Sequence, residues 1–118
     1  MSTTTPKALV TNSAFLPALL TASLATYYTV PAATTTIIKQ FTLRNVTTSP
    51  VLVYVYAVPS GGTADTSNEI FKNYVAPEES ASLLEYFNLT LGPAATIQAY
   101  AGTASAVNIT ASGNERVA

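Results

Sequence analysis

The sequence has 118 residues and a formal net charge of −1, and charged residues make up only 9% of it, against about 25% in an average soluble domain. It contains no Cys and no His, which excludes disulfides, thiolate and imidazole metal sites, and catalysis by a histidine base. Its five basic residues are scattered along the chain, so no phosphate-binding patch for nucleic acid is expected. Much of the polar content is 19 Thr and 10 Ser, and hydroxyl groups can be buried against a partner at lower cost than ions.

Residues 1–7 predict an extended N-terminal arm. After Met1 the arm has no apolar side chain that could anchor it in its own domain, yet its backbone N–H and C=O groups need hydrogen-bond partners. Addition of the arm to the sheet edge of a neighbouring subunit would supply these partners. We therefore expect the following arm residues to contact another subunit: Thr3, Thr4, Thr5, Pro6 and Lys7.

Residues 8–118 predict a single domain. Within 8–25 the pattern is ambiguous and favours extended structure with one possible helical turn after Pro17. Polar residues at 11–13 and Pro17 interrupt this stretch, so it is not a candidate for a membrane-spanning helix. We expect no association with a membrane.

From Thr26 onward the sequence has the alternation and the turn residues typical of short β-strands. In the segment 36–46, Ile37, Phe41 and Leu43 are expected to share one face. The expected strands are 26–30, 36–46, 51–58, 70–75, 81–87, 96–101 and 106–111. The pattern predicts an all-β domain that forms a single antiparallel β-sandwich or jelly roll of about seven or eight short strands.

The segment 51–58 is apolar on both faces, which predicts a strand that is central in the sandwich or exposed at an interface. One face would carry the aliphatic side chains Val51, Val53 and Val55. We expect Tyr54 and Tyr56, on the other face, to contribute to a partner interface, where tyrosine is enriched. The alternative is that these residues, or Tyr27 and Tyr28, form an aromatic platform for a sugar.

No motif predicts catalysis, a metal or a cofactor. The adjacent carboxylates at 78–79 fall in a turn, where neighbouring side chains diverge into solvent. Asp65, Glu69 and Glu85 lack the spacing of a calcium loop, and we do not expect them to act as glycosidase carboxylates. The segment 60–62 has neither the Lys-Ser/Thr of a phosphate loop nor the form of a nucleophile elbow. We therefore expect a protein that is not an enzyme.

Several segments, taken in order, carry a resemblance to a known group of proteins. They are Tyr28–Pro31 with Ile37–Asn45, then Val58–Ala64, Ile97–Ala101 and Val107–Glu115. This order resembles small virion proteins of tailed bacteriophages, which are β-sandwich or jelly-roll accessory components such as head decoration or cement proteins. The resemblance covers roughly residues 26–115 and carries no active-site residues.

The resemblance implies a structural protein of the virion, assembled in the host cytoplasm. It would bind the major capsid protein or other virion proteins and stabilise the head, with itself as a further partner in a homotrimer. The alternative is a tail-associated adaptor or a receptor- or glycan-binding module. The low charge content favours the decoration protein, whereas a monomer that binds sugar would favour the alternative.

Overall fold

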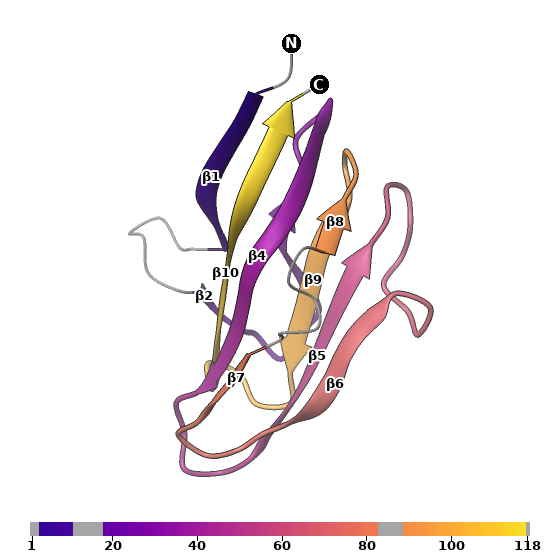
Figure 1. The fold of residues 1–118 in the computed structure, drawn as a ribbon. Coiled ribbons are helices and arrows are strands. Elements are labelled where there is room, and N and C mark those ends of the chain that lie inside the picture. Colours follow the sequence, from indigo (N-terminus) through magenta and orange to yellow (C-terminus); the bar gives the residue numbers. More distant parts are fainter. Residues whose placement is uncertain (1–2, 11–17, 83–88, 118) are drawn as a thin grey trace.

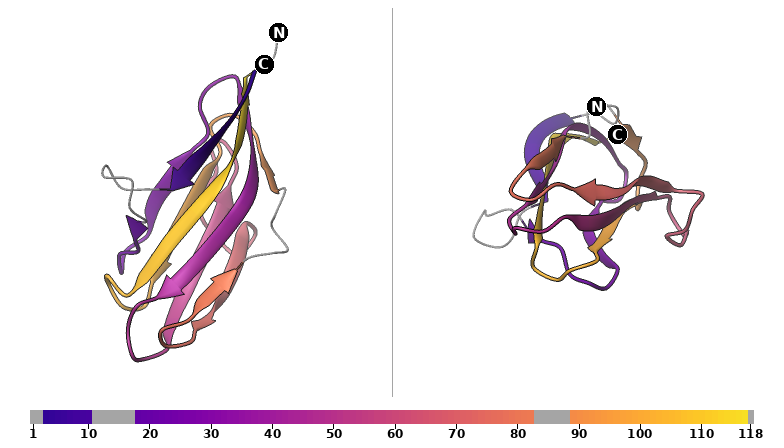
Figure 2. Two further views of the ribbon diagram at one scale, coloured as in Figure 1. Left: turned by 60° about the vertical axis from the view of Figure 1, so that its left-hand side comes forward. Right: turned by 90° about the horizontal axis from the view of Figure 1, so that it is seen from below.

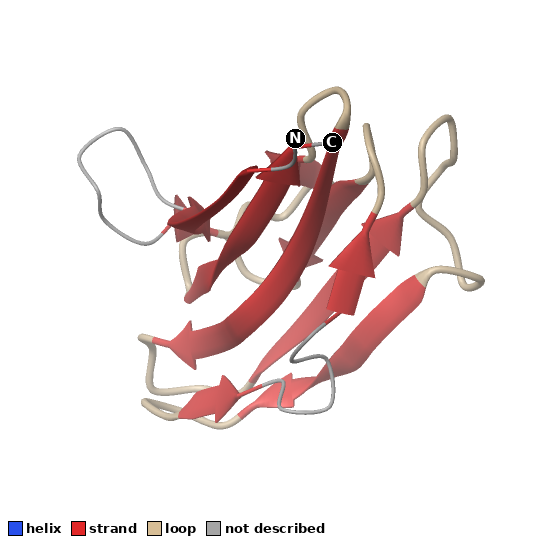
Figure 3. Cartoon of the chain, turned by 45° about the horizontal axis from the view of Figure 1, so that its top comes forward, coloured by secondary structure: helices blue, strands red, loops and turns tan. Residues whose placement is uncertain are grey.

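The computed structural model describes residues 3–10, 18–82 and 89–117, and the regular secondary structure in these ranges consists of β-strands alone (Figures 1 and 3). Since these ranges contain no helix, they contain none that could cross a membrane. The strands are β1 (Thr3–Val10), β2 (Ala18–Leu19), β3 (Ala25–Thr29), β4 (Thr34–Asn45), β5 (Val51–Val58), β6 (Glu69–Val75), β7 (Ser80–Ser82), β8 (Leu89–Leu91), β9 (Thr96–Ala101) and β10 (Val107–Val117).

The strands form two antiparallel sheets that pack as a sandwich (Figure 2). The first sheet has the order β1-β10-β4-β7, with β2 also pairing with β10 and β8 also pairing with β4. The second sheet has the order β3-β9-β5-β6. β1 and β2 share one edge of the first sheet, next to β10, and β7 and β8 share the other edge, next to β4. Each sheet is therefore four strands wide. The chain crosses between the sheets from β2 to β3, β3 to β4, β4 to β5, β6 to β7, β8 to β9 and β9 to β10. This order is typical of a jelly roll and confirms the predicted fold class.

The core lies between the sheets and is built from the inward residues of the long strands. On β5, Val53 and Val55 have no exposed surface, as the alternation predicted. β5 lies between β9 and β6 in the second sheet, so it occupies an interior position. The largest fully buried side chains are Phe41, Leu20, Ile38, Leu43, Ile97, Ile109, Val30, Val53, Val55, Val58 and Val75.

A β-bulge interrupts the pairing of the two longest strands, β4 and β10. Ser112 pairs with Gln40 and Gly113 pairs with Ile38, which leaves Lys39 as the extra residue. A Cβ atom on Gly113 would lie 2.1 Å from the carbonyl oxygen of Ile37, so only glycine fits this close approach. The extra residue also reverses the inward face of β4.

This reversal corrects the expectation that Ile37 shares a face with Phe41 and Leu43. Ile38 is completely buried, whereas Ile37 is only half-buried. Residues before the bulge point inward at even positions, and residues after it point inward at odd positions. The simple alternation of the sequence does not reveal such an insertion.

The N-terminal arm also differs from its expected arrangement. Residues 3–7 are continuous with residues 8–10 in β1, and β1 pairs with β10 of the same chain, from Thr3 opposite Val117 to Val10 opposite Ala111. This pairing supplies backbone partners to the outer side of β10, which would otherwise form a sheet edge. Figure 1 shows the two strands side by side, with both chain termini at the same end of the sandwich.

The remaining expectations are met in part. The predicted strand 81–87 is represented by β7, and residues 83–88 lie outside the described part of the chain. The possible helical turn after Pro17 falls partly outside it as well, and Ala18–Leu19 form the short strand β2.

Candidate interaction surface

The structure does not gather the acidic candidates into a site. Asp65 accepts hydrogen bonds from the backbone N–H and the hydroxyl of Ser67, at 2.8 and 2.5 Å, and these bonds lower the pKa of its carboxyl. Such bonds are typical of an aspartate that stabilises a turn. Glu69 lies on β6, and Glu85 lies outside the described residues. Within the ranges that the structure describes, no three His, Cys, Asp or Glu residues are grouped to hold a metal.

The other two candidate motifs are surface turns. Glu78 and Glu79 are exposed, and Glu78 adopts a left-handed backbone conformation with φ of 57°. At 60–62, the N–H of Gly62 donates a hydrogen bond to the carbonyl of Pro59 at 2.9 Å, which closes a tight turn. Glu78 and Glu79 therefore lie in the turn that the sequence predicted, and the segment 60–62 forms a second turn.

The candidate interface residues fall on different sheets. Residues Thr3–Lys7 lie on β1, at the rim of the first sheet and opposite the last residues of β10. Tyr54 and Tyr56 lie on β5, in the second sheet, and point away from the core. They therefore belong to two surfaces, and their contact with other subunits stays a prediction.

The outer face of the second sheet carries a tyrosine cluster, which consists of Tyr54, Tyr56 and Tyr100. Tyr54 and Tyr100 are direct partners across β5 and β9. Their rings stack, with centroids 4.4 Å apart and planes inclined by 13°. The ring of Tyr56 lies 6.4 Å from that of Tyr100 and is inclined by 14°. Lys72 on β6 places its Nζ 5.5 Å from the ring centroid of Tyr54, within the range of a cation–π interaction.

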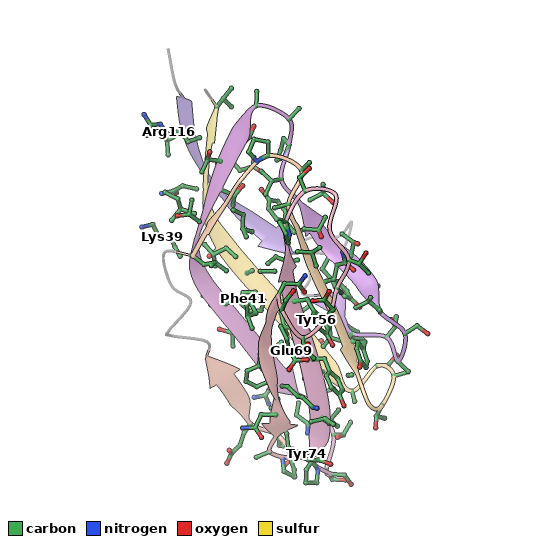
Figure 4. All side chains as sticks on the ribbon, turned by 90° about the vertical axis from the view of Figure 1, so that its right-hand side faces the viewer. Lys39, Phe41, Tyr56, Glu69, Tyr74 and Arg116 are labelled. Atoms are coloured by element: carbon green, nitrogen blue, oxygen red, sulfur yellow. The ribbon has the colours of Figure 1, made fainter. Side chains whose placement is uncertain are left out.

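Tyr56 is the most buried member of this cluster, with 8% of its surface exposed. The pKa of Tyr56 is raised to about 12, mainly by burial and also by the neighbouring hydroxyl of Tyr100 and the carboxylate of Glu69. Figure 4 shows Tyr56 and Glu69 near each other on adjoining strands, with Tyr74 further along β6. The hydroxyl of Tyr100 and the carboxylate of Glu69 therefore both favour the protonated hydroxyl of Tyr56.

The tyrosines do not form the open platform that stacking on a sugar requires. One face of the Tyr54 ring is covered by Tyr100 and another contact is made by Lys72. Tyr28 is buried, and its hydroxyl is hydrogen-bonded to Thr36 and Glu115. Tyr74, which is 62% exposed, is the most accessible large aromatic side chain among the described residues.

Sequence reasoning missed Tyr100 and Lys72 as members of this surface. The alternation of β9 does place Tyr100 on the outward face, beside the polar positions Thr96 and Gln98. Its pairing with Tyr54, however, depends on the register between β5 and β9, and the two tyrosines are 46 positions apart in the sequence. A register of this kind is not a local property of either segment.

The outer face of the first sheet is different in character and forms a hydroxyl face. Thr42 and Thr110 are direct partners across β4 and β10. Ser112 donates a hydrogen bond to Gln40 at 3.2 Å. With Asn108, these five side chains are half-buried or exposed, while the alternate residues of both strands are buried. The face is therefore polar and poor in charge, with the exposed Lys39 of the bulge next to Gln40.

A scan against protein-family models and a search of curated proteins find no match for this chain. Among solved structures, a chain of a Bacillus endospore appendage, from a family described as disulfide-linked pili, is similar with a TM-score of 0.50. The two share 21% sequence identity over 99% of this chain and 89% of that chain. A chain of infectious bursal disease virus, strain Gx, has a TM-score of 0.48 and 11% identity, over 99% of this chain and 32% of that one.

At these identities the likeness to the appendage protein supports the fold alone. The chain contains no Cys, so the disulfide linkage described for the appendage is not available to it.

Proposed function

We propose that this chain is a structural subunit without catalytic activity, which acts by packing against copies of itself and against a larger protein shell. In its most specific form, the proposal is a decoration or cement protein of a bacteriophage head, present as a homotrimer that binds the major capsid protein. The hydroxyl face is the observation that carries the proposal.

The hydroxyl face lies on the two longest strands, β4 with 12 residues and β10 with 11. Its side chains can exchange hydrogen bonds with water for hydrogen bonds with a partner, and their burial does not carry the desolvation cost of ions. Three charged residues lie on exposed positions of these strands: Lys39 at the bulge, and Arg44 and Arg116 toward opposite ends. A surface with so few charges can be covered by another protein at a modest desolvation cost, provided that its hydroxyl and amide groups find hydrogen-bond partners.

The edge strand β1 offers a second way for the chain to contact copies of itself. β1 pairs with β10 in the same chain, and the same pairing can be made with β10 of a neighbour, since exchange of an identical element links subunits without any new type of contact. The arm residues Thr3–Lys7 would then act in assembly, as their sequence predicted.

The proposal is tested with Thr110→Glu and Thr42→Glu, which place a carboxylate on the hydroxyl face. Thr26→Glu, at an exposed position on β3, is the matched control. A carboxylate buried without a partner costs about 3–5 kcal/mol, so binding to shells that lack the protein should weaken about a hundredfold or more. Co-sedimentation with such shells and light scattering of the free protein measure attachment and oligomeric state.

We expect both face variants to fold normally and to lose attachment, while Thr26→Glu retains it. Normal attachment of the face variants would overturn the assignment of this surface. A wild-type protein that is monomeric and does not attach to shells, but binds a glycan, would overturn the proposal in favour of the receptor-binding alternative.

A further inference from the structure

Two of the clustered tyrosines are arranged diagonally across neighbouring strands. Tyr54 is the direct partner of Tyr100, and Tyr56 is the direct partner of Gln98, so Tyr56 and Tyr100 are offset by two residues. Diagonal neighbours of this kind stand about 7–8 Å apart at the backbone, with long side chains still in reach of each other. The rings of Tyr56 and Tyr100 are nearly parallel, with centroids 6.4 Å apart.

The diagonal arrangement matters because of how two phenols join. A covalent bond between two tyrosines joins the ring carbons that are ortho to the two hydroxyls. From this bond, the two rings point away from each other toward their own Cβ atoms. The linked residues therefore need their hydroxyls close together and their Cβ atoms further apart. Directly opposed residues have Cβ atoms only about 4.5–5.5 Å apart, which disfavours the stacked pair Tyr54 and Tyr100.

The surroundings hold the diagonal pair in position. Beneath it, Val55 and Ala99 are completely buried and fix the backbones of β5 and β9. The hydroxyls of Tyr56 and Tyr100 lie close enough to interact, and the carboxylate of Glu69 also interacts with Tyr56. Tyr100 is half-exposed and stacks on Tyr54, so an oxidant in solution can reach the cluster through these two rings.

We propose that Tyr56 and Tyr100 form a site of oxidative cross-linking, in which a peroxide-dependent one-electron oxidant joins β5 to β9 through a dityrosine bond. Each phenol gives up one electron and its hydroxyl proton, and Glu69 or water accepts the proton of Tyr56. The two phenoxyl radicals pair to form a carbon–carbon bond between the ring carbons next to the oxygens. The hydrogens on these carbons then move to the oxygens, which restores both aromatic phenols.

The reaction is balanced by the peroxide. The two phenols together lose two electrons and two protons, and one hydrogen peroxide takes these up to give two water molecules. The product is an internal covalent link in a chain that has no Cys with which to make one. The link closes the chain between residues 56 and 100 and restricts the unfolded state, as a disulfide does.

The test treats the dilute full-length protein with hydrogen peroxide and a peroxidase. We expect the monomer to lose two hydrogens by intact mass, to gain dityrosine fluorescence, and to melt at a higher temperature. Proteolysis and mass spectrometry should then recover a linked peptide that contains Tyr56 and Tyr100. Because the peptide is read in the wild-type protein, this measurement does not depend on the folding of any variant.

Variants separate the proposed pair from the other tyrosines. Tyr56→Phe and Tyr100→Phe should each abolish the internal link, whereas Tyr54→Phe and the exposed Tyr74→Phe should retain it. The proposal is overturned if the monomer acquires no link, if the recovered peptide joins Tyr54 to Tyr100, or if cross-links form only between chains.

Discussion

The hydroxyl of Tyr28 on β3 donates a hydrogen bond of 2.5 Å to the carboxylate of Glu115 on β10. The same hydroxyl lies 2.6 Å from the hydroxyl of Thr36 on β4. Because β3 belongs to the second sheet and β4 and β10 to the first, this group of three residues ties the two sheets together. Tyr28, which as a sequence feature was a candidate for sugar binding, is therefore a structural residue.

Replacement of Tyr28 by Phe should destabilise the fold by about 1–3 kcal/mol. The change removes the hydroxyl from a buried hydrogen-bond group and leaves the carboxylate of Glu115 and the hydroxyl of Thr36 without this contact. Urea unfolding followed by circular dichroism measures the effect. Tyr74→Phe is the matched control and should stay within about 0.5 kcal/mol of wild type, since Tyr74 is exposed. Equal stability of the two variants would contradict the structural role of Tyr28.

Stability should fall as the pH rises from about 10 to about 12. The pKa of Tyr28 is raised from 10.0 to about 12, first by burial and then by the bond to Glu115, and that of Tyr56 is raised to about 12. In this window the unfolded chain releases these protons while the folded chain keeps them, so the folded state becomes less favoured with increasing pH. The free energy of unfolding, measured in urea at a series of alkaline pH values, reports this loss.

The variants Tyr28→Phe and Tyr56→Phe identify the groups responsible. Each should show a shallower decrease in stability between pH 10 and 12 than the wild type, because one perturbed hydroxyl is absent. An unchanged pH dependence in both variants would assign the loss to other groups.

Replacement of Gly113 by Ala should destabilise the protein by about 2–4 kcal/mol. The added Cβ would meet the carbonyl oxygen of Ile37 at 2.1 Å, so the bulge between β4 and β10 would have to shift. Gly92→Ala is the control, because nothing lies within 4 Å of a Cβ at that position. Thermal unfolding of both variants measures the difference, and a Gly113→Ala protein with wild-type stability would show that the bulge adapts easily.

Deletion of residues 2–7 should weaken self-association and attachment to shells more than it affects the fold. The deletion removes the partners of Gly113 to Val117 on one side of β10, but no apolar side chain. We therefore expect a β-type circular-dichroism spectrum and cooperative unfolding, with a modest drop in stability. Light scattering and co-sedimentation measure assembly. If the truncated protein unfolds, the arm belongs to the fold; if it assembles normally, the arm is dispensable for assembly.

The sequence by itself determined the class of the protein. Alternation along segments such as 51–58 and 96–101 predicted strands, and the aliphatic residues on their inward faces are buried. These properties are readable because the side-chain period of a strand is local. Absence of Cys and His likewise restricted the possible chemistry before any fold was considered.

Only the tertiary structure decided which residues meet. The bulge at Gly113 buries Ile38 instead of Ile37, and the register of β5 with β9 brings Tyr100 to Tyr54 and Tyr56. The residues of the arm pair with β10 because that strand extends to Val117. Each of these outcomes depends on backbone pairing between segments far apart in the chain, and the alternation within a single strand carries no information about its partner or register.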